Sequence, residues 1–121
     1  MVFIQKYIVM KTATLNKGIE YNETKPTINV MLETEGSKEI RIAMKTGQFM
    51  KEHKTPFPIV VEMFEGNLDF GVKGEVLNLE RGDMLALEGD IPHDLVCTKD
   101  CIVRLSLSKL DKVERVLDVI K

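Results

Sequence analysis

The stretch IVVEMFEGNLDFGVKGEVLNLERGDMLAL, residues 59–87, decides the fold class. Its short apolar runs are interrupted by Glu65-Gly66-Asn67, Lys73-Gly74 and Arg81-Gly82-Asp83, which combine glycine with polar or charged neighbours. Short runs rich in Val, Leu and Phe that alternate with such turns are typical of a β-sandwich or β-barrel. The stretch therefore predicts strands at residues 59–64, 68–72, 76–79 and 84–87.

The same pattern continues outward in both directions. Further strands are predicted at 3–10, 27–32, 39–44, 94–97 and 102–107, and the last two flank Thr98-Lys99-Asp100 as a hairpin would. After residue 108 the period changes, because Leu110, Val113, Leu117 and Ile120 recur every three or four residues, as on one face of a helix. We predict one all-β domain over residues 1–121, with N-terminal strands in 1–37, a barrel core in 38–108 and a short C-terminal helix at 109–121.

Composition narrows the function classes. The 121 residues carry 17 basic and 19 acidic side chains, a formal net charge of −2, so no bulk positive field favours nucleic acid. No apolar run approaches the ~18–20 residues that span a bilayer. The apolar start of the chain is broken by Gln5 and Lys6, unlike a signal peptide. We expect a cytoplasmic protein that binds neither nucleic acid nor membrane.

Two glycine–histidine spacings resemble the motifs of the cupin superfamily, in particular small single-domain bacterial cupins. In the first motif, G-x5-H-x-H-x3–4-E-x6-G, Gly47 precedes His53 by six residues and Gly66 closes the motif. In the second, G-x5-P-x-G-x2-H-x3-N, Gly82 precedes His93 at the family spacing. The resemblance covers roughly residues 39–108 and implies a jelly-roll β-barrel.

The departures from these motifs concern the metal site. The resemblance implies three histidines and one glutamate around one ion, but Thr55 replaces the second histidine and Ile59 replaces the glutamate. The second motif has Glu88, Asp90 and Cys97 in place of Pro, Gly and Asn. Tight Zn, Fe or Mn sites take three or four protein ligands. We therefore expect no bound cofactor, and the alternative left open is a weakly held divalent metal on His53, His93 and Cys97.

Strand alternation predicts a pocket around the two histidines. Residues two apart share one face of a strand, so Ile59, Val61 and Met63 face inward with the family ligand position, and Glu62 faces outward. His93, Leu95 and Cys97 share a face by the same count. Both histidines of the chain fall on family ligand positions, which favours one shared pocket over two unrelated structural histidines. The predicted pocket comprises His53, Thr55, Ile59, Val61, Met63, His93, Leu95 and Cys97.

Cys97 and Cys101 flank the predicted hairpin turn, which would allow a cross-strand disulfide. Two reduced thiols are favoured, because nothing in the sequence indicates an oxidising compartment.

Three functions fit the sequence. The first is a binding protein that holds a small organic ligand between His53 and His93. The second is an enzyme, either a metal-dependent oxygenase or isomerase with a reduced ligand set, or a metal-free sugar epimerase or isomerase with a histidine base. The third is a structural or regulatory dimer. We expect a homodimer in any case, because Val60 and Phe64 lie on the outward face of their strand.

Overall fold

The protein is described here by a computed structural model of residues 9–110 and 119–120. The elements are all strands: β1 (Thr27–Glu33), β2 (Ser37–Met44), β3 (Phe49–His53), β4 (Ile59–Val72), β5 (Glu75–Leu79), β6 (Met84–Leu87) and β7 (His93–Ser108). Every pairing between them is antiparallel. The predicted all-β class is confirmed. The described part of the chain contains no helix that is long and apolar enough to cross a membrane.

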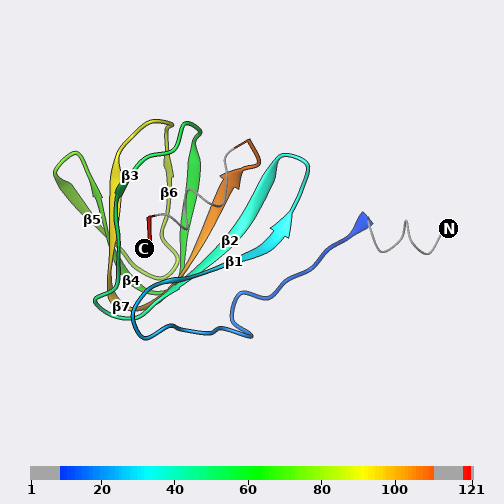
Figure 1. Cartoon of the computed structure of the whole chain (residues 1–121), viewed down its shortest axis with the longest axis horizontal. Coiled ribbons are helices and arrows are strands. Elements are labelled where there is room, and N and C mark those ends of the chain that lie inside the picture. The colour runs from blue at the N-terminus through cyan, green and yellow to red at the C-terminus, as the bar shows by residue number, and fades with distance from the viewer. Residues whose placement is uncertain (1–8, 111–118, 121) are drawn as a thin grey trace.

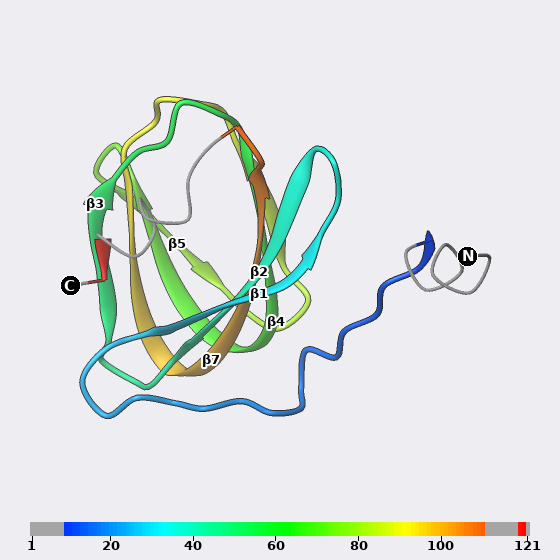
Figure 2. The same cartoon turned by 45° about the vertical axis from the view of Figure 1, so that its right-hand side comes forward.

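Two long strands, β4 and β7, run through the whole barrel and belong to both of its walls (Figures 1 and 2). The second half of β7 pairs with β2 and with the first half of β4, which also pairs with β6. The first half of β7 pairs with β3 and with the second half of β4, which also pairs with β5. We call these walls sheet I (β1-β2-β7-β4-β6) and sheet II (β3-β7-β4-β5).

The passage from one sheet to the other occurs at Gly66. Buried residues of β4 fall on odd numbers up to Met63 and on even numbers from Gly66 onward, and the pairing with β7 shifts between Met63 and Leu68. An extra residue in a strand causes such a shift and a local bend. A Cβ on Gly66 would lie 2.1 Å from the carbonyl oxygen of Asp100, so the two bent strands touch here.

The continuous course of β4 and β7 through this bend contradicts two predictions made from the sequence. The break expected at 65–67 is wrong, because β4 continues through it. The hairpin expected at 98–100 is also wrong, because β7 continues from His93 to Ser108. β3 was not predicted at all. The strand predicted for 3–10 and the helix predicted for 109–121 fall largely outside the described residues, and the helix is not confirmed.

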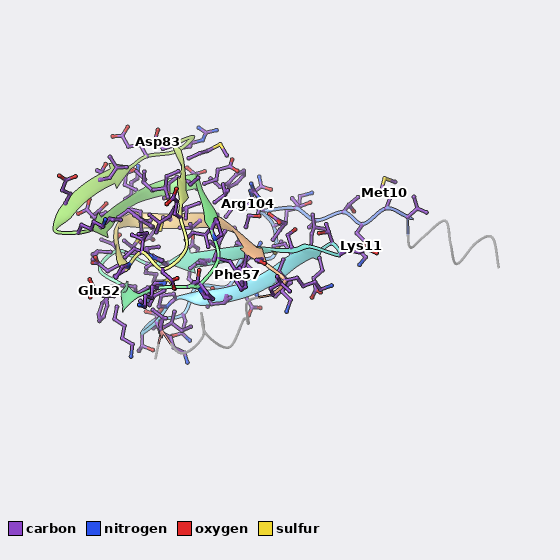
Figure 3. The ribbon with its side chains drawn as sticks, turned by 90° about the horizontal axis from the view of Figure 1, so that it is seen from above. Met10, Lys11, Glu52, Phe57, Asp83 and Arg104 are labelled. Atoms are coloured by element: carbon purple, nitrogen blue, oxygen red, sulfur yellow. The ribbon has the colours of Figure 1, made fainter. Side chains whose placement is uncertain are left out.

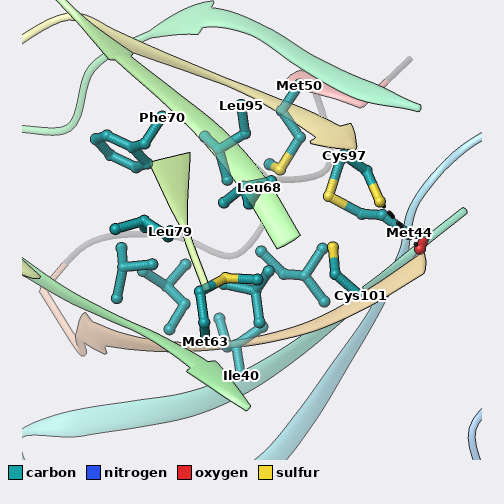
Figure 4. Packing of buried hydrophobic residues seen from close by; sticks show 14 of the residues in the cluster. Ile40, Met44, Met50, Met63, Leu68, Phe70, Leu79, Leu95, Cys97 and Cys101 are labelled. Atoms are coloured by element: carbon teal, nitrogen blue, oxygen red, sulfur yellow. Dashed lines mark hydrogen bonds between the residues drawn. The ribbon is translucent and has the colours of Figure 1, made fainter. Parts of the chain in front are cut away.

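The core lies between the two sheets, and its largest fully buried side chains come from β2, β4 and β7 (Figure 4). Val119 and Ile120 also belong to this core. The N-terminal segment runs along one end of the barrel and then out past the β1–β2 hairpin, where Lys11 borders a hollow that β1 also lines (Figure 3). The buried guanidinium of Arg41 holds part of this segment, because it donates hydrogen bonds to the carbonyl oxygens of Leu15, Lys17 and Gly18.

Candidate functional site

The two histidines meet where β3 lies beside β7. His53 and His93 are register partners in this antiparallel pair, and their ring centroids lie 4.2 Å apart with the planes inclined at 60°. The structure therefore places side by side two residues that are forty positions apart in the sequence.

Both imidazoles are held in the same way. Nδ1 of His53 lies 2.7 Å from the carbonyl oxygen of Lys51, and Nδ1 of His93 lies 2.9 Å from that of Ile91. A carbonyl oxygen can only accept a hydrogen bond, so Nδ1 carries the proton in each ring. Nε2 is then an acceptor in both neutral rings, and neither Nε2 has a hydrogen-bond partner among the residues that the structure describes.

Burial keeps both rings neutral. Removal from water lowers the pKa of His53, and the neighbouring His93 lowers it further, while the hydrogen bond to Lys51 opposes the shift. Burial also lowers the pKa of His93, against the hydrogen bond to Ile91. The Asp94 carboxylate raises the pKa of both rings, but by less than burial lowers it, so charging either ring costs free energy in these surroundings.

The rings border a small apolar cavity of about 30 Å³, enough for roughly one water molecule. Phe70 of β4 stacks on His93, with ring centroids 5.4 Å apart and planes inclined by 10°. The cavity walls carry six of the eight predicted pocket residues: His53, Thr55, Ile59, Val61, His93 and Leu95. A wider hollow of about 1020 Å³ lies beside β1 and the N-terminal segment, and it contains none of the eight.

The other two predicted pocket residues, Met63 and Cys97, are buried but do not line the cavity. Sγ of Cys97 lies instead 3.5 Å from the carbonyl oxygen of Met44 and 3.2 Å from that of Lys99, and both oxygens can accept its single proton. Six further residues line the cavity and were not predicted to do so: Ile42, Met50, Phe70, Val103, Leu105 and Leu107. The alternation of residues along the predicted strand at 102–107 could have identified Val103, Leu105 and Leu107 as inward-facing. The inward position of Phe70 could not be predicted, because the sequence does not show that the buried residues of β4 change from odd to even numbers at Gly66.

Cys97 and Cys101 lie on the same strand rather than across a hairpin, and both are free, buried thiols. A hydrogen bond from Cys101 lowers the pKa of Cys97, and the same bond together with burial raises the pKa of Cys101. The pair is separate from the histidine cavity, so Cys97 does not complete a ligand set with the two imidazoles.

The side chains around the histidines do not fit a tightly held metal ion. The described residues contain no group of three His, Cys, Asp or Glu side chains arranged around one point. The hydroxyl of Thr55 donates to the carbonyl oxygen of Phe57 at 2.7 Å, and Ile59 has no donor atom. Glu62 faces outward, where it accepts a hydrogen bond from Arg104 at 2.9 Å. Two imidazole nitrogens alone remain, fewer than such sites use.

Comparison with known proteins identifies the architecture. No protein-family model matches the sequence, and no curated protein is significantly similar to it. Solved structures do match. An RmlC-like cupin from Desulfovibrio desulfuricans superposes with a TM-score of 0.75 at 22% identity, over 82% of this chain and 96% of that one.

Two further structures agree. KdgF from a Halomonas species has a TM-score of 0.73 at 14% identity, over 87% of this chain and 99% of that one. A cupin superfamily protein from Desulfitobacterium hafniense has a TM-score of 0.69 at 11% identity, over 74% and 83%. The chain therefore has the cupin fold that its sequence resembles.

Proposed function

We propose that this chain binds a small organic ligand inside the barrel and that His53 and His93 make the polar contacts with it. The observation that carries the proposal is the pair of Nε2 atoms, both without a partner among the described residues, beside an apolar cavity. Sites for small molecules combine apolar walls with a few fixed polar groups. The hydrogen bonds from Nδ1 to the carbonyls of Lys51 and Ile91 fix the orientation of both rings.

The neutral rings determine which ligands bind. Each Nε2 accepts a hydrogen bond, so a hydroxyl or N–H group on the ligand satisfies it at neutral pH. A carboxylate or phosphate would stabilise the imidazolium form and raise the pKa of the rings, reversing the effect of burial. An anionic ligand is therefore held more tightly as the pH falls, whereas a neutral donor is held less tightly.

The metal-dependent alternative has less support. Two imidazoles without a third ligand leave an ion mainly in contact with water, which gives weak binding. We assign no chemical step to a metal in this chain.

The chain has 2 histidines, so selective ¹⁵N-labelling of histidine gives a spectrum with only the two rings of the site. We would titrate the labelled protein with acetate, phosphate and phenol, and measure the ring ¹⁵N shifts. Both rings should respond to at least one of these molecules with the same apparent Kd. If only one ring responds to every molecule that binds, or if neither ring responds to any, the proposal is wrong.

A further inference from the structure

A slit of about 490 Å³ opens on the side of the barrel between β5 and β6. These two strands are the edges of sheet II and sheet I, and each pairs with a different half of β4. The slit is lined mainly by apolar side chains, among them Val72, Leu77, Leu85 and Leu87. Its volume lies within the ~300–1,000 Å³ range of small-molecule sites, unlike that of the histidine cavity.

The slit is part of the barrel interior that no strand covers. Leu77 and Leu79 are two residues apart on β5, so their side chains lie on the same face of the strand. Leu77 pairs with Phe70, and Leu79 pairs with Leu68. Leu79 is 2% exposed, as expected for an inward residue, but Leu77 is 56% exposed. On the opposite edge, Leu85 and Leu87 pair with the buried Val61 and Ile59 and face the same interior. The edges of the two sheets therefore leave apolar side chains in contact with water.

Phe70 separates this slit from the histidines. It lines both the slit and the inner cavity, and it is 2% exposed. Its ring lies flat against His93. If the ring rotates about its side-chain bonds away from His93 and leaves the slit open, the two spaces join into one site that reaches the imidazoles.

We propose that ligands reach the histidines through the slit between β5 and β6 and that the bound ligand takes the place of the Phe70 ring against His93. This inference rests on the proposed ligand-binding function and adds the class of ligand. A flat aromatic ring retains the stacking that His93 now has with Phe70. Lys73 and Glu75 also line the slit, but the other seven lining residues are apolar, which disfavours a highly charged molecule. The ring carries a hydrogen-bond donor, because each Nε2 atom is an acceptor, and the single proton of that donor is taken by one of the two Nε2 atoms. The ligand class is a small phenol-like aromatic.

Three molecules of similar size separate these features. Phenol has the flat ring and the donor, cyclohexanol has the donor without the flat ring, and toluene has the ring without the donor. With the ¹⁵N ring shifts of both histidines as the readout at pH 7.5, phenol should bind roughly 3- to 10-fold more tightly than either of the others. Equal affinity for phenol and cyclohexanol would overturn the stacking argument.

The route is tested on exposed positions that a substitution should not unfold. Leu77→Trp fills the slit and should weaken phenol binding at the histidines by roughly 10-fold or more. Met84→Trp is the matched control, because Met84 is 60% exposed on β6 but does not line the slit. Its affinity for phenol should equal that of the unmodified protein.

Phe70→Leu removes the stacked ring while leaving an apolar side chain, so phenol should bind more tightly than to the unmodified protein. Leu68→Met is its control, because Leu68 is fully buried on the same strand but lines neither space, and this change nearly conserves volume. Its affinity for phenol should equal that of the unmodified protein. If phenol shifts both histidine signals but neither Leu77→Trp nor Phe70→Leu changes its affinity, the route through the slit is wrong and the proposed function stands. If neither phenol nor the anions shift either signal, the proposed function is wrong and this inference with it.

Discussion

Replacing Gly66 by alanine should destabilise the barrel more than the same change at any open glycine turn. Gly66 has a φ of +78°, where an L-residue costs roughly 1–2 kcal/mol. The added Cβ would also lie 2.1 Å from the Asp100 carbonyl oxygen and 2.7 Å from Cα of Cys101. Both contacts are with backbone, so β4 and β7 must separate, and overpacking of this kind costs about 1–3 kcal/mol more. The total of about 2–5 kcal/mol is a large part of the ~5–15 kcal/mol that stabilises a domain.

Gly74→Ala is the matched control. Gly74 has almost the same backbone angle, with a φ of +79°, but a Cβ there meets nothing within 4 Å. It should cost only the strain, about 1–2 kcal/mol. Urea unfolding followed by circular dichroism measures both, since the chain has no tryptophan for fluorescence. If the two variants lose the same free energy of unfolding with unchanged m-values, the close approach of the strands at Gly66 does not contribute as argued.

Three further predictions concern the site and the surface. Burial lowers the pKa of His53 and His93, so the unfolded chain binds more protons than the folded chain at a pH just below the ordinary histidine pKa of ~6.5. The free energy of unfolding should therefore fall as the pH drops through that region. The double variant His53→Asn/His93→Asn should lose this pH dependence, and an unchanged pH dependence would contradict the burial argument. Protein dialysed against a mild chelator should hold no stoichiometric Zn, Fe, Ni or Mn by elemental analysis, and about one ion per chain would show that the ligand count is wrong. We expect a homodimer through the outward face that carries Val60 and Phe64, and a sedimentation mass near 13.8 kDa at micromolar protein would refute it.

Local patterns predicted most of the strands, but they could not predict how two strands bend. The strands at 27–32, 39–44, 76–79 and 84–87 lie within one or two residues of β1, β2, β5 and β6. Gly66 and the polar Thr98-Lys99-Asp100 have the composition of turns, so β4 and β7 were each divided in two. A glycine inside a strand indicates either a turn or a bulge, and the choice depends on the partner strand, which is distant in the sequence.

β3 was missed because its pattern is weak. Only Met50 among its residues is fully buried, and the pairing with β7 shifts between Met50 and His53. The position of His53 could be predicted only from the spacing of the family motif.

Alternation predicted the facing of Cys97 but not its depth. His93, Leu95 and Cys97 all point inward, as expected. Four residues of strand, however, span roughly 13 Å, so residues that share a face need not share a cavity. Cys97 therefore lies beside the bend with Cys101, and of the residues between it and His93 only Leu95 lines the cavity.

The central position of β7 determines when this chain can fold during its synthesis. Of the strands within the described residues, β7 is the last to emerge, and it pairs with β2, β3 and β4. Until residues 93–108 have been synthesised, β3 has no partner strand among the described strands, and β4 has only β5, its hairpin neighbour, and β6. The earlier strands must therefore wait in a partly unpaired state with exposed edges, which is the condition under which nascent β-proteins aggregate or bind chaperones. A ribosome paused before residue 93 would carry a chain with two hairpins and no barrel.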